Sequence, residues 1–397
     1  MTRRLYYADS SIRQFDAVVV SCTEADGRVR VVLDQTAFYP SSGGQPFDTG
    51  RIGPAAVVDV IDREAGEVEH VVSAPVEVGA RLAGEIDWPR RFDHMQQHTG
   101  QHVLSAAFGR VCDAPTLSFH MGTETSTIDL GREVSTAEMA SAESEANRVV
   151  WEDRPVDVRF VTAEEARRLP LRKPPARGGE LRLVDIRDFD LSACGGTHVA
   201  TTGVIGLIGV TAWERFKGGT RVSFVCGGRA LRSHRELREV VAGACRSLSV
   251  APADLGAQIE RVQQAARDAD RKASVLQAEL SAARAREWGR EAQAIGHHLV
   301  VLRHVSSGDG AALKQLAQAI VGSPRLVAAL IGQGQPAPVV VARAAGVDLD
   351  AGAVVRSMTA ALGGRGGGRL ELAQAGVPAS PEAIVTFLRQ LFGAPVA

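Results

Sequence analysis

Residues 1 to about 90 alternate short β-branched runs with polar turns. The runs are FDAVVVSCTE, RVRVVLDQTAFYP, AAVVDVI and EVEHVVS, and Asp, Gly and Pro separate them. Valine and isoleucine in short runs between turn residues favour strands. Because no long helical pattern interrupts these runs, the sequence predicts a small β-barrel or sandwich over residues 1–90.

Residues 91–233 mix helical and extended patterns. We expect a helix from about 91 to 110, a hairpin formed by TLSFHMG and TSTIDLG, and a helix over 136–151 that begins after the cap Ser135. Strands near VDVRFV, LRLVDIR, GLIGVTAW and TRVSFVCG follow. Together these elements predict an α+β domain.

Residues 234–296 have the character of a helical linker. Apolar side chains recur there in steps of four and three with charged residues between them, which is the seam of a coiled coil. The seam positions are Leu255, Ile259, Val262, Ala266, Ala269, Ala273, Leu276, Leu280 and Ala283. The pattern fits an antiparallel helix pair or a coiled coil that forms a homodimer through residues 254–296, and spacing does not choose between them.

Residues 297–397 return to apolar strands separated by helical stretches. HLVVLRHV, RLVAALIG and PVVVARAAG are predicted strands, and 311–321 and 351–362 are predicted helices. The pattern predicts a small α/β domain. Within it, GGRGGGR (363–369) is expected to be too glycine-rich for any regular element.

Composition limits the partners of the chain. It has 45 Lys and Arg against 46 Asp and Glu, so a nucleic acid would need a local basic patch. Aromatic residues make up only 5%, which argues against broad base-stacking surfaces. The five cysteines lack disulfide spacing, and no segment approaches the roughly 18 apolar residues of a membrane span. We therefore expect a cytoplasmic protein without membrane contact.

The clearest candidate chemistry is a metal site. His94, His98 and His102 lie four residues apart, so a helix would place them on one face. Cys194 and His198 repeat this spacing around two glycines. A thiolate together with imidazoles is a ligand set that Zn²⁺ prefers. The alternative is that Cys194 is a small buried hydrophobic residue beside a glycine turn.

These motifs resemble a known family. HTGQHVLS (98–105) and CGGTHV (194–199) look like the paired zinc motifs of the editing domain of alanyl-tRNA synthetases and of free-standing alanyl-tRNA editing proteins of the AlaX type. FYPSSGGQPFDTG (38–50) is similar to the glycine motif of that family's N-terminal barrel. GTRVSFVCGGRAL (219–231) and GGRGGGRLELAQAG (363–376) resemble the end of the editing domain and the C-terminal domain. The long free-standing form fits best, because no aminoacylation domain precedes the barrel.

The resemblance implies an aminoacyl-tRNA deacylase. Its expected substrate is Ser-tRNA(Ala), with Gly-tRNA(Ala) as a second open candidate, and Ala-tRNA(Ala) is expected to be spared. A site that hydrogen-bonds the serine hydroxyl can reject alanine strongly, because its own polar groups would otherwise stay unpaired.

The resemblance also implies one Zn²⁺ per chain, held by His98, His102, Cys194 and His198, with His94 outside the site. Four protein ligands are typical of a closed site, so it stays open whether zinc activates water or positions the substrate. Gly43, Gly44 and Gln45 belong to the loop that approaches the pocket and favours serine, unless this loop is an ordinary hairpin turn. Thr116 and Ser118 are candidates to bind the serine hydroxyl. Gln97 and Gln101 are expected to be structural or to surround the ligands, and not to be catalytic.

Two basic segments are candidates for tRNA contact, since clustered cations neutralise phosphates without reading bases. In the loop 166–187 they are Arg167, Arg168, Arg172, Lys173 and Arg177, followed by Arg182 and Arg187. In the glycine-rich segment they are Arg365 and Arg369. A basic loop that is merely solvated is the alternative.

Two other functions are compatible with the sequence. The first is a related zinc-motif deacylase for another amino acid, because threonyl-tRNA editing uses a similar domain. The second is an inactive protein that binds tRNA or a synthetase through residues 254–397.

Overall fold

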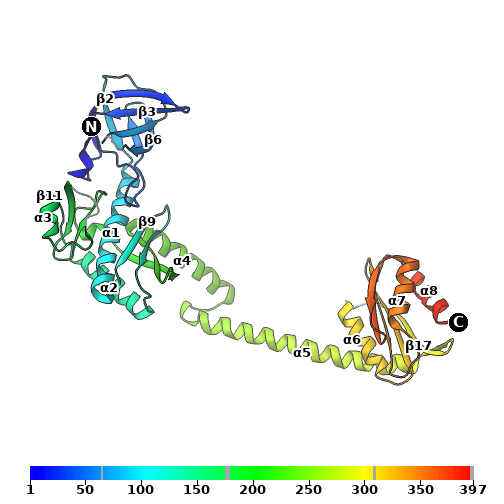
Figure 1. Ribbon diagram of the computed structural model, residues 1–397. Coiled ribbons are helices and arrows are strands. Elements are labelled where there is room, and N and C mark those ends of the chain that lie inside the picture. The colour runs from blue at the N-terminus through cyan, green and yellow to red at the C-terminus, as the bar shows by residue number, and fades with distance from the viewer. Residues whose placement is uncertain (64–65, 175–178, 307–309, 394–397) are drawn as a thin grey trace. The chain divides into compact units, whose positions relative to one another are not determined.

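The computed structural model describes residues 1–63, 66–174, 179–306 and 310–393 of the chain (Figure 1). Arg177, a predicted tRNA contact, lies outside the described residues. The chain divides into two compact units, Met1–Ala244 and Cys245–Ala397. Each unit has hydrophobic cores of its own. Among the described residues, no helix combines the length and apolar character that crossing a membrane requires.

The first unit begins with a closed barrel of six strands in the order β2-β3-β7-β6-β5-β8. The strands are β2 (Gln14–Ala25), β3 (Arg28–Leu33), β5 (Gly50–Ile52), β6 (Ala55–Asp62), β7 (Val68–Val72) and β8 (Arg81–Ile86). Neighbouring strands are antiparallel, and alternate side chains such as Val31 and Leu33 fill the interior. The small barrel is confirmed, and the sandwich alternative is wrong. The strand β1 (Arg3–Arg4) precedes the barrel strands and pairs with β4 (Gln35–Thr36), which follows β3. The short helix η1 (Leu5–Tyr7) comes directly after β1.

Two sheets and two helices follow the barrel. The helices are α1 (Trp88–Cys112) and α2 (Thr136–Trp151). The sheet β14-β15-β10-β9 comprises β9 (Thr116–Met121), β10 (Ser126–Leu130), β14 (Ile208–Phe216) and β15 (Gly219–Cys226). The sheet β11-β12-β13 comprises β11 (Val156–Thr162), β12 (Glu180–Ile186) and β13 (Asp190–Ala193). Short helices α3 (Ala163–Arg167) and η2 (Thr202–Ile205) and the longer α4 (Gly227–Leu248) complete the unit.

This layer has the predicted α+β character. The hairpin β9–β10 and the helix α2 lie where the sequence predicts them. Ser135 caps α2, because its side chain accepts a hydrogen bond from the backbone N–H of Glu138 while the Glu138 carboxylate accepts one from the backbone of Ser135. One core of side chains from α1, α2 and the sheets joins these elements, so α1 is buried along much of its length.

The second unit is a mixed sheet with helices on both faces. Its strands, in the order β16-β17-β18-β19-β21-β20, are β16 (Gln293–Ile295), β17 (His298–Val305), β18 (Leu326–Gly332), β19 (Ala337–Arg343), β20 (Arg365–Gly368) and β21 (Leu372–Val377). The helices are α6 (Gly310–Val321), α7 (Ala351–Leu362) and α8 (Pro381–Gly393). Side chains of α6 share a core with one face, and those of α7 and α8 share a core with the other.

The expectation for the segment GGRGGGR is wrong. Arg365–Gly368 forms β20, which pairs with β21 in an antiparallel register at the edge of the sheet. Glycine is required there because a Cβ on Gly366 would approach the Cβ of Ala375 to 2.4 Å. The close approach of two backbones therefore explains the glycines, and a strand forms in spite of their low strand propensity.

The predicted seam lies on a single helix, α5 (Leu255–Arg290), which follows η3 (Pro252–Asp254). In Figure 1 it runs as one uninterrupted helix. Its apolar side chains are exposed at Ile259, Val262, Leu276 and Leu280 in this single chain. The residues 255–283 are thus helical as predicted, and the seam presents an apolar stripe that either predicted partner would cover.

The buried His70 should make the barrel sensitive to acid. Its ring lies between the hydroxyl of Thr36 and the carbonyl of Val31 and is fully buried. Burial lowers the pKa of His70 to about 4, against 6.5 for an exposed histidine. Between these values the unfolded chain binds the proton and the folded barrel does not, so acid favours unfolding. We expect this residue to lower the free energy of unfolding of the barrel by up to about 1.4 kcal/mol for each unit by which the pH falls between 6.5 and 4.

Denaturant unfolding of wild type and His70→Gln at pH 7 and pH 5 tests this expectation. The glutamine variant should lose less stability on acidification than wild type. His234→Gln, at an exposed position of α4, is the matched control and should behave as wild type. Equal acid sensitivity of wild type and His70→Gln would contradict the assignment.

Candidate metal centre and its pocket

The helix α1 presents two of the candidate ligands. It begins after Asp87, whose carboxylate accepts a hydrogen bond from the backbone N–H of Arg90, and it carries a proline in its first turn. His98 and His102 lie one turn apart on this helix and are 3% and 4% exposed. Because packed elements surround α1, these imidazoles point into the unit and away from bulk water.

Cys194 and His198 meet these two histidines from the loop 194–198, which follows β13 and which we call the metal loop. The potential ligand atoms of His98, His102, Cys194 and His198 lie within 4.8 Å of one another. The Sγ of Cys194 is 3.4 Å from the Nε2 atoms of both His98 and His198. A Cβ on Gly196 would lie 2.1 Å from the Cε1 of His98, so only glycine lets the loop approach the helix this closely.

A second set of polar groups orients the three imidazoles. The Nδ1 atoms lie 2.7 Å from Gln45 Oε1 for His98, 3.0 Å from Asp190 Oδ2 for His102 and 3.1 Å from Thr99 Oγ1 for His198. With each Nδ1 engaged in this way, each Nε2 is free to face the common centre. This is the arrangement by which outer groups fix metal-binding histidines, so the residues fit a tetrahedral Zn²⁺ site.

The electrostatics of the cluster favour a thiolate. Burial raises the pKa of the Cys194 thiol, but His98 and His198 outweigh it and hold the pKa well below its usual range. Burial lowers the pKa of His198 to about 3, which keeps this imidazole neutral near pH 7. A thiolate and a neutral imidazole are protonation states that bind zinc. Burial also lowers the pKa of His102, but its bonds to Asp190 and Cys194 outweigh burial and raise that pKa.

The cluster lies in the wall of a pocket of about 360 Å³. The pocket is lined by His98, His102 and Cys194 together with Tyr39, Gly43, Gln101, Thr116, Ser118, Phe119, Arg172, Lys173 and Ser192, among others. Thr116 is buried and donates a hydrogen bond to Ser105 Oγ over 2.8 Å. Ser118 is exposed at the rim and donates to Asp129 over 2.6 Å. Both predicted hydroxyls therefore lie at the pocket, and Thr116 lies deeper in the protein.

The glycine loop of the barrel reaches the same site. Gly43 lines the pocket, whereas Gly44 has φ +84° and its carbonyl accepts a hydrogen bond from Met121 in β9. Gln45 is only 2% exposed and does not line the pocket. Its side chain instead bonds His98, the Thr197 hydroxyl and the Thr197 backbone N–H. The loop thus contributes one residue to the pocket and one to the orientation of a candidate ligand.

Removal of the Gln45 amide should weaken metal binding without removing a ligand. In Gln45→Ala the Nδ1 of His98 loses its acceptor, so the ring can rotate away from the centre. Loss of such an outer partner typically costs about 10–100-fold in metal affinity. Competition with a chromophoric chelator measures the zinc dissociation constant.

Gln14→Ala, at an exposed position of β2, is the matched control and should keep the wild-type zinc affinity. Wild-type zinc affinity in Gln45→Ala would show that the bond to His98 is dispensable.

The remaining polar residues of α1 have other roles. His94 is buried and is not a member of the four-residue cluster, and its Nδ1 has no hydrogen-bond partner among the described residues. Gln97 exchanges hydrogen bonds with the backbone N–H and carbonyl of Cys226, which ties α1 to β15. Gln101 donates to Ser105 Oγ and also lines the pocket. Gln97 thus joins two elements of the fold, whereas Gln101 lies beside the candidate ligands at the pocket.

The described basic residues of the predicted loop 166–187 separate into distinct groups, and Arg182 lies in the strand β12. Arg172 and Lys173 line the pocket, whereas Arg167 and Arg168 are exposed near the end of α3. Arg182 is 7% exposed and donates to the carbonyls of Cys194 and Gly196, so it is a clamp on the metal loop.

The other predicted cations are exposed. Arg187 lies at the surface near Asp157. Arg365 and Arg369 are exposed at the glycine-rich edge of the second unit.

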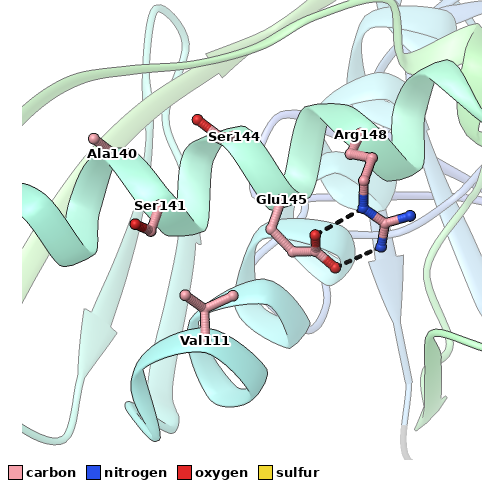
Figure 2. Close-up of a pocket in the computed structure, with 6 residues that line it drawn as sticks. All are labelled: Val111, Ala140, Ser141, Ser144, Glu145 and Arg148. Atoms are coloured by element: carbon pink, nitrogen blue, oxygen red, sulfur yellow. Dashed lines mark hydrogen bonds and ion pairs between the residues drawn. The ribbon is translucent and has the colours of Figure 1, made fainter.

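A second hollow, of about 460 Å³, lies between the end of α1 and α2. In Figure 2, Val111 of α1 lies below α2, which carries Ala140, Ser141, Ser144, Glu145 and Arg148. The Glu145 carboxylate accepts two hydrogen bonds from Arg148, at 2.8 and 2.7 Å. The polar lining of this hollow is Ser141, Ser144 and this ion pair, and none of the four candidate metal ligands belongs to it.

Sequence reasoning missed Asp190, although a signal was present. Asp190 and Ser192 alternate along β13 and lead to Cys194, so a strand places their side chains on the same face. Asp190 is 5% exposed. Burial raises the pKa of its carboxyl, but the bonds from His102 and Arg172 outweigh this effect and bring the pKa down to about 2.

Known proteins match both units of the chain. The model of the Threonyl and Alanyl tRNA synthetase second additional domain matches residues 181–223, and the model of the DHHA1 domain matches residues 299–394. Alanine–tRNA ligases of Pyrococcus abyssi and Pyrobaculum neutrophilum are 32% and 36% identical over 94% of this chain. The chain spans 42% of the length of each of these ligases.

One relative matches along its whole length. The alanyl-tRNA editing protein AlaX-L of Pyrococcus horikoshii is 31% identical over 397 aligned residues, which cover 97% of this chain and 96% of that protein. The two family models lie in the order that the sequence motifs predict, with the metal loop inside the first model. The chain therefore belongs to the family of alanyl-tRNA editing proteins of the AlaX-L type.

Proposed function

We propose that the chain is a zinc-dependent deacylase that hydrolyses the ester of Ser-tRNA(Ala) in trans and spares Ala-tRNA(Ala). The observation that carries the proposal is the convergence of His98, His102, Cys194 and His198 in the wall of a pocket that also holds hydroxyl and cationic side chains. The family to which the chain belongs, named for alanyl-tRNA editing, supports the same substrate class.

The residues of the chain supply position and charge in this reaction. Zinc, when held by the four side chains, would supply a fixed positive charge beside the aminoacyl ester. Arg172 and Lys173 bring two further cations to the pocket, where they can bind phosphates of the tRNA 3′ end. Orientation of the ester and an attacking water in this way can account for much of a rate enhancement.

Serine selectivity is assigned to the polar floor of the pocket. The Thr116 hydroxyl donates its hydrogen bond to Ser105 Oγ. Its oxygen can therefore accept a hydrogen bond from the hydroxyl of a bound serine. Alanine would leave this buried oxygen without its hydrogen bond, which costs about 1–3 kcal/mol. Gly43 lines the pocket and leaves room for the amino acid of the substrate. Glycine can therefore enter the pocket as well, and its binding affinity decides whether Gly-tRNA(Ala) is a second substrate.

Side-by-side deacylation assays test the proposal. Purified full-length protein with quantified zinc is incubated with Ser-, Gly-, Thr- and Ala-tRNA, and the remaining ester is measured over time. We expect rapid loss of Ser-tRNA(Ala) and no loss of Ala-tRNA(Ala) beyond the uncatalysed rate. Thr116→Val keeps a side chain of similar size without the hydroxyl. It should lower the deacylation rate of Ser-tRNA(Ala) by about tenfold and bring it closer to the rate on Ala-tRNA(Ala).

Other outcomes identify the rival functions. Faster hydrolysis of Thr-tRNA than of Ser-tRNA(Ala) would make the chain a deacylase for another amino acid. Binding of tRNA with every ester left intact over hours would make it an inactive binding protein.

A further inference from the structure

The carboxylate of Asp190 is shared between the metal cluster and the basic segment at the pocket. Its Oδ2 lies 3.0 Å from the Nδ1 of His102, and its Oδ1 accepts a hydrogen bond from Arg172 Nε over 2.7 Å. Ser192 Oγ donates to Oδ2 over 2.9 Å, which holds the carboxylate in this orientation. The side chain of Asp190 is 1% exposed, so solvent does not replace a bond that is lost.

The other end of this bridge is the segment Arg172–Pro174, which lines the pocket. The backbone N–H of Arg172 donates to the carbonyl of Leu191, next to Asp190, over 2.9 Å. Lys173 donates to the carbonyl of Leu117, in β9, over 3.2 Å. The segment is therefore attached both to β13, which leads to the metal loop, and to β9.

Arg172 has hydrogen-bond donors that its contact with Asp190 does not use. Its Nε is bonded to Asp190, whereas its two terminal nitrogens make no hydrogen bond to any residue that the structure describes. Its side chain is 21% exposed and belongs to the lining of the pocket. A guanidinium held at one edge with its other donors open is suited to bind a phosphate oxygen.

We propose that Asp190 couples the metal site to phosphate binding, so that zinc at His102 and the terminal phosphates of an RNA 3′ end at Arg172 strengthen each other's binding. The inference rests on the proposed function only for the identity of the RNA. In the orientation that the structure shows, one Asp190 carboxylate holds both His102 and Arg172. A ligand that orders either partner therefore lowers the cost of ordering the other.

The coupling is reciprocal and can be measured without catalysis. If RNA tightens zinc binding by some factor, zinc must tighten RNA binding by the same factor. The zinc dissociation constant is measured by chelator competition, with and without saturating uncharged RNA stem-loop that ends in CCA. The RNA dissociation constant is measured on zinc-loaded and zinc-stripped full-length protein. We expect a coupling factor of about tenfold in wild type, within the range of typical allosteric couplings.

Three variants separate coupling from simple loss of charge. Arg172→Gln should reduce the coupling factor to about one while its zinc affinity without RNA stays within about threefold of wild type. Lys173→Gln is the matched control, because it removes a neighbouring pocket cation that does not contact Asp190. It should weaken RNA binding and keep the wild-type coupling factor. Asp190→Asn should abolish coupling and weaken zinc binding about 10–100-fold.

Each result decides the proposal. A coupling factor of one in wild type, or a wild-type factor in Arg172→Gln, would overturn it and leave the ion pair with Asp190 as a purely structural contact. Equal coupling by an RNA that lacks the CCA end would also overturn it. Deacylation of Ser-tRNA(Ala) by the same preparation reports separately on the proposed function, because the coupling is measured with uncharged RNA.

Discussion

Replacement of Cys194 with alanine is expected to abolish both stoichiometric zinc and deacylation. The thiolate is the only anionic member of the four-residue cluster, and the pKa of its thiol is held well below the usual range by His98 and His198 although burial opposes this. Structural zinc sites contribute about 10–16 kcal/mol, so one ligand of four carries about 3 kcal/mol and its loss weakens binding by roughly 100-fold or more. We expect less than one tenth of the wild-type zinc content after dialysis and a fall in deacylation of similar size.

Zinc content is measured by elemental analysis, and deacylation of Ser-tRNA(Ala) is measured on the same samples. Cys22→Ala, at a half-buried thiol in β2, is the matched control and should keep both properties. Loss of zinc with full activity would remove zinc from the reaction, whereas retained zinc in Cys194→Ala would remove Cys194 from the ligand set.

The four members of the cluster could be predicted because short spacings determine them. His98 and His102 are one helical turn apart, and this relation survives any tertiary arrangement of the helix. The prediction that Cys194 and His198 converge with these two histidines rested on ligand chemistry and on the family resemblance, because the two pairs are distant in sequence. The structure brings the four together, with the loop glycine Gly196 against His98.

The contacts that orient the candidate ligands could not be predicted from such spacings, apart from the alternation of Asp190 and Ser192 along β13. Gln45 comes from the barrel, Thr99 from α1 and Asp190 from β13, and each meets a histidine more than 50 positions away in sequence. Such contacts depend on how a barrel, a helix and a sheet pack together, which periodicity does not report. The same limit explains Arg182, a charged residue in a basic stretch that tertiary packing turns inward onto the metal loop.

The glycine-rich segment failed for a related reason. Strand propensity describes how a side chain packs on a pleated surface, and glycine has none to pack. In β20 the neighbouring strand β21 comes so close that a side chain at Gly366 or Gly368 would collide with Ala373 or Ala375. The pairing of β20 with β21 thus requires residues without a Cβ. Strand propensity counts the same residues against a strand.

The largest expected effect on stability comes from Asp48→Asn. Asp48 and Arg91 are both fully buried, and the carboxylate receives hydrogen bonds from the Nε and Nη2 atoms of Arg91 and from the backbone N–H of Tyr39. Arg91 further donates to the carbonyls of Ser10 and Ala37, so the pair joins the barrel to the start of α1. Asparagine would leave the guanidinium as an unpaired buried charge. We expect a loss of about 3–5 kcal/mol in the free energy of unfolding of the first unit.

Urea unfolding followed by intrinsic fluorescence measures this loss in the transition of the first unit. Arg168→Gln is the matched control, because it breaks an ion pair with Glu164 in which both side chains are more than 70% exposed, and it should leave the transition unchanged. The double variant Asp48→Leu with Arg91→Met should recover part of the loss, since well-packed apolar residues often replace a buried ion pair without cost. A loss below about 1 kcal/mol in Asp48→Asn would mean that Arg91 finds compensation elsewhere. The carbonyls of Ser10 and Ala37 would then be enough to hold Arg91 at the start of α1.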